Sequence, residues 1–325
     1  MRTIEEYIRL AEKAVGSIKL PKRPAGLYEP ITYGLSNGGK RLRPALLLAA
    51  CEAAGKDCTA ALSQAAAIEM FHNFTLLHDD VMDNADLRRG KPTVCRKWDN
   101  NTAILSGDTM LTLATQLLVE GVAPDKAARL LDIFNRAAIG VYEGQQYDME
   151  FESRNDVTEE EYIDMIRLKT SVLLGCAAQL GAEIGDAEER QGMALYGFAM
   201  NLGIAFQLQD DWLDVYGDPA VFGKATGGDI MNNKKTFLLI KAMELAEGND
   251  KKNLQYWLDI KDADPEKKIS AVTAIYDSLG IGDICQKSVE KHNAEALRCL
   301  GKSGLTAEAA GFFEEFDRMV MNRKK

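Results

Sequence analysis

Several features that would mark a secreted, membrane-spanning or zinc-binding protein are missing from this 325-residue sequence. Its six cysteines include no C-x-x-C pair, which favours buried thiols over a disulfide framework or a zinc site. No apolar run reaches the roughly 18 residues needed to span a bilayer, and the N-terminus has a charged helical pattern, not a signal peptide. We therefore expect a cytoplasmic protein without stable membrane insertion.

A basic stripe is also missing, since the net charge is −10. Proteins that bind nucleic acid need clustered Lys and Arg to replace counterions, so no nucleic-acid partner is expected. With this overall charge, an anionic substrate would need metal ions to be held.

Proline is scarce, with 8 residues, and neither a Ser/Pro-rich linker nor a short internal repeat is visible. Apolar residues recur at three- and four-residue spacing without sustained alternation, which predicts an all-α protein forming a single domain, residues 1–325. Helices are expected at roughly 3–17, 44–54, 59–83, 100–120, 125–150, 158–182, 187–216, 233–247, 265–278, 283–300 and 306–322.

The stretch FHNFTLLHDDVMD, residues 71–83, ends in an acidic D-D-x-x-D pattern. On a helix Asp79 and Asp83 lie one turn apart on one face, with Asp80 on the flank. Such carboxylates repel each other unless a cation lies between them, and Mg²⁺ takes one or two carboxylates plus water and phosphate oxygens. A solvated helix face is the alternative reading, but an apolar helix precedes the acids and Arg88 and Arg89 follow them.

Basic residues with glycines appear before the second predicted helix, in N-G-G-K-R-L-R-P. Lys40 and Arg43 beside a helix start suit a phosphate, although a basic, glycine-rich turn can equally be a solvated loop. His72 is two turns before Asp79 on the same face, and is either a ligand-binding residue or a satisfied core histidine.

The acidic pattern occurs a second time, in FQLQDDWLD, where Gln207, Asp210 and Asp214 share a helix face and Asp211 lies beside them. Glycines and lysines follow in F-G-K and in GGDIMNNKKT. Between the two acidic stretches lies Lys169, inside a core-like helix, and a buried lysine needs an anionic partner unless it extends to solvent.

Two carboxylate helices can hold several Mg²⁺ ions with a diphosphate between them, while Lys and Arg cover the remaining oxygens. A diphosphate so neutralised is a good leaving group, and an apolar shaft beneath it would keep water from the resulting carbocation. The sequence therefore points to ionisation of an allylic diphosphate.

The motifs quoted above, together with GQQYD and KTS, resemble the trans-isoprenyl diphosphate synthases (polyprenyl synthetases) in order across residues 38–236. The resemblance implies a bundle of about 10–13 helices around a deep central cavity, usually as a homodimer. It also implies head-to-tail (1′-4) condensation of isopentenyl diphosphate with dimethylallyl, geranyl or farnesyl diphosphate, using about three Mg²⁺ ions per site.

The same resemblance assigns roles to individual positions. Catalytic residues would be Lys169, Thr170 and Gln207, which stabilise the carbocation, while the departing diphosphate removes the proton. Metal-binding or supporting residues would be Asp79, Asp80, Asp83, Asp148, Asp210, Asp211 and Asp214. The allylic diphosphate would be held by Arg88, Lys169, Lys224 and Lys234, and isopentenyl diphosphate by Lys40, Arg43, His72 and Arg89. The basic tail, Asn322 to Lys325, would close over the site or fray.

Product length in this family depends on where a bulky side chain blocks the shaft. The resemblance makes Phe74, five residues before the first aspartate, the floor, with Phe71 one turn lower and small Thr75 beside it. Helical geometry places Thr75 and Phe71 nearer the Asp79 face than Phe74, so the floor role rests on the resemblance. We expect C15 to C20 products, geranylgeranyl slightly ahead of farnesyl.

Two other functions are compatible with parts of this pattern. A class I terpene cyclase would carry an Asn/Ser/Glu metal motif where this chain has Asp210 to Asp214. A non-catalytic partner subunit of another prenyl synthase usually lacks aspartates or the arginine pair, and all of these are present here.

Overall fold

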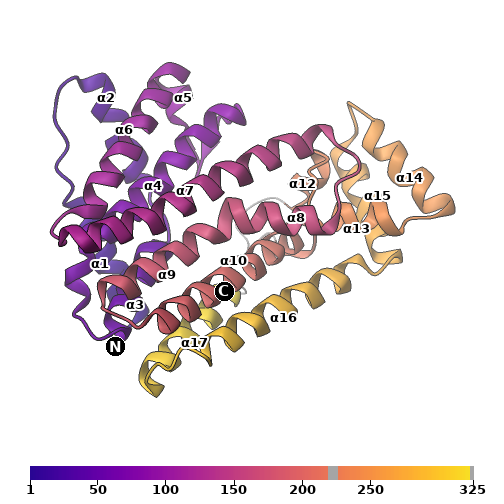
Figure 1. Cartoon of the computed structure of the whole chain (residues 1–325). Helices are drawn as coiled ribbons and strands as arrows, with labels where there is room; N and C mark the ends of the chain where they lie inside the picture. Colours follow the sequence, from indigo (N-terminus) through magenta and orange to yellow (C-terminus); the bar gives the residue numbers. More distant parts are fainter. Residues whose placement is uncertain (219–225, 323–325) are drawn as a thin grey trace. The chain divides into compact units, whose positions relative to one another are not determined.

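The computed structural model describes residues 1–218 and 226–322, and almost all of their regular structure is helical (Figure 1). The all-α prediction is confirmed. Within the described ranges the only strands are β1 (Leu87–Arg88) and β2 (Lys91–Pro92), which form one antiparallel hairpin.

The residues pack into two compact units. Unit 1 consists of Met1–Arg136, Cys176–Tyr196 and Ser303–Phe312. Unit 2 consists of Ala137–Gly175, Gly197–Lys302 and the residues from Phe313 on.

Unit 1 is built around a central helix, α4, because the residues of its first half are buried all the way round. Its run of Ala65, Ala66 and Ala67 has small side chains, which lets α1, α3 and α6 pack closely against it. The helices with residues in unit 1 are α1 (Ile4–Gly16), α2 (Ala25–Ser36), α3 (Leu42–Ala53), α4 (Leu62–Met82), α5 (Val94–Lys97), α6 (Asn100–Val119), α7 (Pro124–Ser153), α9 (Val172–Ile184), α10 (Glu189–Tyr216) and α17 (Ala307–Met321), with a 3₁₀ turn at Cys58–Ala61.

Unit 2 has its own apolar core, in which Leu208 of α10, Phe237 and Tyr276 are buried together. Helix α15 contacts α12, α14 and α16, so it supports the short helix α12. Unit 2 contains the remaining parts of α7, α9, α10 and α17, and also α8 (Glu159–Ile166), a π-helical turn η2 (Arg167–Ser171), α12 (Gly228–Met231), α13 (Phe237–Leu245), α14 (Gly248–Asp259), α15 (Pro265–Ser278) and α16 (Ile281–Leu300).

Two twelve-residue helices were not predicted, and two predicted helices need correction. Helices α2 and α14 were not expected, because α2 contains Pro30 and α14 buries only Leu254, so neither shows a long apolar stripe. The helix expected over 158–182 is interrupted by η2. The helix expected from 233 begins only at Phe237, because Asn233 has a left-handed backbone with φ of 51°.

Helix α6 is, among the described residues, the one helix long and apolar enough to cross a membrane by length and composition, with a mean hydropathy of 1.2 over its most apolar window. A core helix of a water-soluble fold passes the same test, and α6 packs along α4 within unit 1. Its outer face carries the exposed apolar side chains of Ile104 and Leu105.

Candidate active site

The first aspartate motif lies at the C-terminal end of α4 in unit 1. Asp80 is buried, and its Oδ1 accepts a hydrogen bond from Nε of Arg88 at 2.7 Å. Burial raises the pKa of Asp80, while the Arg88 guanidinium opposes that rise. Asp79 is partly exposed and Asp83, the C-cap residue of α4, is exposed. The structure therefore separates one supporting carboxylate from two that face outward.

The outward pair fits Mg²⁺. Asp79 and Asp83 lie at the negative end of the α4 dipole, where added carboxylates are unfavourable unless a cation neutralises them. Within the parts of the chain that the structure describes, no three His, Cys, Asp or Glu side chains are close enough to form a complete metal site. A Mg²⁺ site takes one or two protein carboxylates and completes its coordination with water and substrate oxygens.

A two-residue hairpin turn places the arginine pair. Arg88 pairs with Lys91 across the hairpin, and the turn residues Arg89 and Gly90 both have positive φ, 54° and 75°. Positive φ at both positions is characteristic of a type I′ turn, which glycine adopts freely and arginine does not. The turn sends Arg88 to Asp80 and Arg89 to the carbonyl oxygen of Gly38, to which Nη1 of Arg89 donates.

Four arginines of unit 1 form what we call the arginine cluster: Arg41, Arg43, Arg88 and Arg89. Among the described residues, two buried carboxylates are paired with this cluster: Glu69 with Arg41, and Asp80 with Arg88. Burial is the main cause that lowers the pKa of Arg43 and of Arg89, and the neighbouring guanidiniums add to it. Positive charge thus exceeds negative charge here, as a diphosphate site requires.

His72 contributes a neutral group to the arginine cluster. Nη1 of Arg43 lies 3.4 Å from Nε2 of His72, and since arginine can only donate, Nε2 is the acceptor. Burial, followed by the charges of the four arginines, lowers the pKa of His72 well below its usual value. Nε of Arg43 is buried and has no hydrogen-bond partner, so an anion that accepts from it would complete the site. Lys40 is exposed on the adjoining turn.

Arg41 supports this arrangement, although sequence reasoning did not single it out. It is the N-cap of α3 in a left-handed conformation, φ 49°, and its buried guanidinium is paired with the Glu69 carboxylate. Nη2 of Arg41 also donates to the Leu35 carbonyl oxygen at 3.0 Å, and Nδ2 of Asn73 donates to Glu69 at 3.3 Å.

Replacing Glu69 with glutamine is expected to lower the free energy of unfolding by about 3 kcal/mol, because a buried guanidinium loses its counter-charge. Urea denaturation of the purified variant measures the change, with the exposed Glu12→Gln as control. A loss below about 1 kcal/mol would show that the buried pair is not needed for stability.

The second aspartate motif, on α10 in unit 2, shows the same division of roles. Asp210 is partly exposed, whereas Asp211 is buried and accepts hydrogen bonds from the Tyr162 hydroxyl and, at 3.3 Å, from the backbone N–H of Phe237. Burial raises the pKa of Asp211 to about 7. Oδ2 of Asp214 accepts from the backbone N–H of Asp229 at 3.0 Å. Asp211 and Asp214 therefore fasten the GGDIMNNKKT segment to α10.

Lys169 and Thr170 lie in the π-helical turn η2 between α8 and α9. Nζ of Lys169 is 2.5 Å from Oδ2 of Asp148 on α7, so the anionic partner expected for this lysine is present. Thr170 Oγ1 donates to Oε1 of Gln207 at 3.4 Å. The three residues assigned to the carbocation and the carboxylate of GQQYD are thus contiguous within unit 2. A π turn inside a helix is frequently found at functional sites.

Two glycines make room for η2. A Cβ atom on Gly144 would lie well under 3.0 Å from the backbone of Lys169, and one on Gly203 would lie 2.7 Å from Ser171 Oγ. The glycine of GQQYD is therefore needed for the close approach of α7 to the backbone that carries Lys169.

Replacing Gly144 with alanine is expected to push α7 away from η2, to lower the melting temperature by several degrees and to reduce kcat at least about tenfold. The matched control is Gly140→Ala on the same helix, where the added Cβ meets only ordinary contacts from 3.4 Å. Melting curves and initial rates of both variants test this, and equal behaviour of the two would contradict it.

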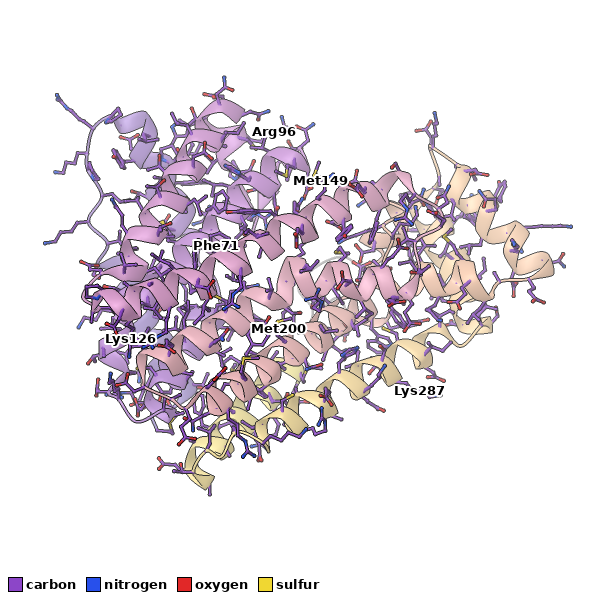
Figure 2. The ribbon with its side chains drawn as sticks, in the orientation of Figure 1. Phe71, Arg96, Lys126, Met149, Met200 and Lys287 are labelled. Atoms are coloured by element: carbon purple, nitrogen blue, oxygen red, sulfur yellow. The ribbon has the colours of Figure 1, made fainter. Side chains whose placement is uncertain are left out.

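The residues assigned to chain length lie on α4. Phe74 is buried, with its ring 5.4 Å from that of Phe71 and 4.7 Å from the imidazole of His78. Phe71, labelled in Figure 2, is fully buried and packs edge-on against Phe134 at 5.0 Å. Thr75 is partly exposed, and its hydroxyl donates to the carbonyl oxygen of His72 at 2.8 Å.

Of the remaining basic positions assigned from the sequence, the structure describes Lys234 but not Lys224 or the end of the tail. Lys224 and the tail residues Arg323 to Lys325 lie outside the described residues. Lys234 follows α12, its side chain is half exposed, and its Nζ is 3.9 Å from Oδ1 of Asp229.

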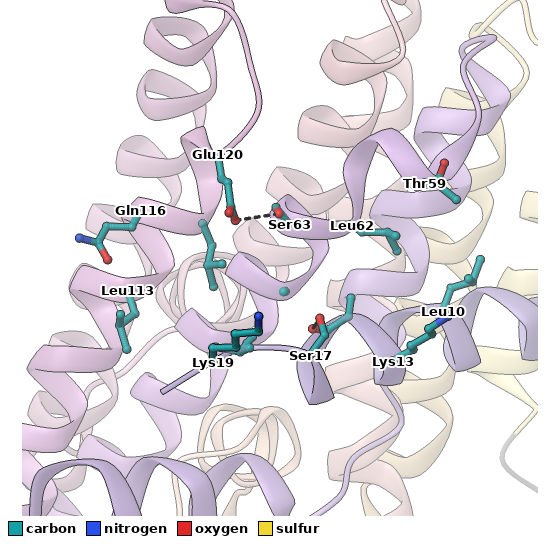
Figure 3. A pocket seen from close by; sticks show the side chains of 14 residues that line it. Leu10, Lys13, Ser17, Lys19, Thr59, Leu62, Ser63, Leu113, Gln116 and Glu120 are labelled. Atoms are coloured by element: carbon teal, nitrogen blue, oxygen red, sulfur yellow. Dashed lines mark hydrogen bonds between the residues drawn. The ribbon is translucent and has the colours of Figure 1, made fainter. Parts of the chain in front are cut away.

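A pocket of about 840 Å³ in unit 1 lies away from this chemistry. It is lined by side chains of α1, the N-terminal end of α4 and the C-terminal end of α6, and Ser63 Oγ donates to Glu120 across it at 2.9 Å (Figure 3). Asp79 lies thirteen positions after Ala66 of the pocket, which corresponds to about 20 Å along α4. The pocket is not part of the diphosphate site.

An all-α fold with two aspartate motifs, an arginine cluster and a lysine in a π turn defines the class of enzymes that transfer groups from diphosphate esters. The family model described as "Polyprenyl synthetase" matches residues 24–276. The chain belongs to the polyprenyl synthetase family, which confirms the resemblance recognised in the motifs and makes the protein a prenyltransferase.

Curated relatives include two geranylgeranyl diphosphate synthases. The one from Sulfolobus acidocaldarius is 39% identical over 298 residues, covering 89% of both chains, and the one from Methanosarcina mazei is 42% identical over 235 residues, covering 72% of both. A crystal structure of a geranylgeranyl pyrophosphate synthase superposes with a TM-score of 0.94 at 42% identity and covers 100% of both chains.

Proposed function

We propose that this chain, as a single catalytic domain of residues 1–325, condenses isopentenyl diphosphate head-to-tail (1′-4) with allylic diphosphates. The product is an all-trans prenyl diphosphate of C15 to C20, with geranylgeranyl slightly favoured over farnesyl. The observation that carries the proposal is that each aspartate motif combines one buried carboxylate, fixed by hydrogen bonds, with two carboxylates that are at least partly exposed. The activities named for the two relatives support the upper end of this range.

The first step would be departure of the allylic diphosphate. Asp79, Asp83 and Asp210 would hold Mg²⁺, about three ions per site, which neutralises the leaving group when bound. Asp80, Asp211 and Asp214 would keep the basic groups in place, since each accepts hydrogen bonds from such a segment. The allylic diphosphate oxygens would be bound by Arg88, Lys169, Lys224 and Lys234.

Lys169, Thr170 and Gln207 would act on the carbocation. The Asp148 carboxylate holds the Lys169 ammonium, and Thr170 donates to Gln207, so the oxygens of Thr170 and Gln207 are held in place before the charge develops. The C4 atom of isopentenyl diphosphate then bonds to C1 of the allylic cation, and the released diphosphate takes the proton from the new chain.

Isopentenyl diphosphate would be bound by Lys40, Arg43, His72 and Arg89. Arg43 and Arg89 provide the guanidinium groups of the cluster that Glu69 and Asp80 do not neutralise. Neutral His72 adds an N–H donor at Nδ1, because its Nε2 accepts from Arg43.

The assembly proposed is a cytoplasmic homodimer. Ile104 and Leu105 on α6 are 42% and 59% exposed. Adjacent exposed apolar side chains on a helix are typical of surfaces that a second subunit covers.

Incubation of the purified protein with labelled isopentenyl diphosphate, an allylic primer and Mg²⁺, followed by sizing of the products, tests the proposal. We expect linear C15 to C20 diphosphates. Cyclic hydrocarbons would indicate a terpene cyclase instead, and failure to consume isopentenyl diphosphate with dimethylallyl, geranyl or farnesyl diphosphate would indicate a non-catalytic subunit.

A further inference from the structure

A buried lysine outside all the motifs, Lys268 on α15, contacts the segment that carries Lys234. Lys268 is 2% exposed, and its Nζ donates to Oδ1 of Asn233 at 2.7 Å and to the carbonyl oxygen of Met231 at 3.3 Å. Burying an ammonium group is costly unless its donors are satisfied, so this placement needs a reason.

The contacted residues form a helix-ending turn. The backbone N–H of Lys234 donates to the carbonyl oxygen of Asp229 at 3.0 Å. The backbone N–H of Asn233 donates to the carbonyl oxygen of Ile230 at 3.2 Å. These two bonds, with Asn233 left-handed at φ 51°, constitute a Schellman motif at the end of α12. In this motif the direction of Lys234 depends on Asn233 keeping its left-handed conformation.

The side-chain amide of Asn233 makes hydrogen bonds through both its oxygen and its nitrogen. Its Oδ1 accepts from Lys268, and its Nδ2 donates to the carbonyl oxygen of Leu258 at 3.0 Å. The Met231 carbonyl is one of those left without an intrahelical partner at the helix end, and Lys268 supplies that partner.

The start of the same segment also rests on α15. A Cβ atom on Gly227 would lie 2.6 Å from Ile269, the residue after Lys268, and Gly227 has φ of 83°. The first two turns of α15 thus support the segment at both ends of α12. Burial lowers the pKa of Lys268, which accords with an ammonium group surrounded by protein.

We propose that Lys268 is a positioning residue for the condensation: its ammonium group fixes the Asn233 turn and thereby directs Lys234 toward the allylic diphosphate. The inference rests on the proposed role of Lys234 as a ligand of that diphosphate. Lys268 itself touches no substrate in this scheme, and acts only through the conformation of the turn.

The test compares Lys268→Met, which keeps the apolar stem, with Lys268→Arg and with the exposed neighbour Lys267→Met. In Lys268→Met we expect KM for the allylic diphosphate to rise roughly tenfold, while KM for isopentenyl diphosphate changes less than about twofold. Lys268→Arg is expected to recover most of the loss, and Lys267→Met to match wild type. A merely structural role would reduce the active fraction without separating the two KM values, and that result would overturn the proposal.

A second variant decides the matter if Lys268→Met does not fold. Asn233→Gly keeps the left-handed conformation accessible but removes both side-chain bonds. We expect the same selective rise in KM for the allylic diphosphate, and wild-type values would overturn the proposal.

The activity of the wild type and the allylic KM of Lys234→Ala show whether a failure concerns the proposed function or only the role of Lys268. An inactive wild type would refute the function itself. An active wild type whose allylic KM responds to Lys234→Ala but not to Lys268→Met would refute only the role of Lys268.

Discussion

Replacing Asp79 with asparagine is expected to lower kcat by about 10³-fold, because one of the two outward carboxylates of the first aspartate motif is lost. A loss of this size corresponds to about 4 kcal/mol of transition-state stabilisation, a reasonable value for charge neutralisation by a metal ion. Asparagine has nearly the same shape as aspartate, so the fold is expected to keep its stability. Initial rates measured across a Mg²⁺ titration test the expectation.

The matched control is Asp86→Asn. Asp86 is exposed, lies only a few residues beyond the motif, and is paired with Arg96 at 2.6 Å on the surface, where such a pair contributes little. We expect near wild-type rates for this variant. If Asp79→Asn showed wild-type kcat at saturating Mg²⁺, Asp79 would not be a metal ligand that matters for catalysis.

Replacing Phe74 with alanine is expected to lengthen the product by at least one C5 unit. The ring of Phe74 is buried between Phe71 and His78, so its removal opens space directly below the residues that precede Asp79. The same change would lower the free energy of unfolding by about 3–5 kcal/mol through the cavity it leaves. Chromatography of the products after dephosphorylation measures their length.

Two further variants separate product length from stability. Phe74→Leu leaves a smaller cavity and is expected to shift the distribution in the same direction. Phe198→Leu removes a buried ring that packs on Phe313 in unit 2, and is expected to lose stability without changing product length. An unchanged distribution from active Phe74→Ala enzyme would contradict the floor role assigned to this residue.

Helical spacing was sufficient to predict the elements that carry the acidic motifs. Asp79 and Asp210 lie on α4 and α10, and these long helices have enough apolar residues to be recognised from their period. The assignment of metal, substrate and chain-length roles to individual residues stays a prediction.

Backbone conformations at the site were not predictable from the same spacing. Arg41, Arg89 and Asn233 adopt positive φ without being glycine, and such conformations are imposed by the tertiary contacts around them. The two-residue Arg89-Gly90 turn was the one local signal that could have revealed the hairpin, since a glycine follows a polar residue there.

Two polar partners in unit 2 were missed for a different reason. Tyr162 lies on α8, 49 residues before the aspartate to which it donates, and Lys268 lies 35 residues beyond Asn233. Neither has a neighbour in the sequence that marks its role. Only the packing of unit 2 brings these polar groups to their partners.

The π turn at residues 167–171 has a consequence for how this chain tolerates insertions and deletions. A π turn holds one residue more than the α-helical turn it replaces, so every side chain of α9 is rotated by about 100° from the phase that α8 would have imposed. The apolar faces of α8 and α9 therefore point in different directions, although the two helices follow each other without a loop. Deleting a single residue from η2 would bring the two helices into one phase and turn one of those faces away from its partners.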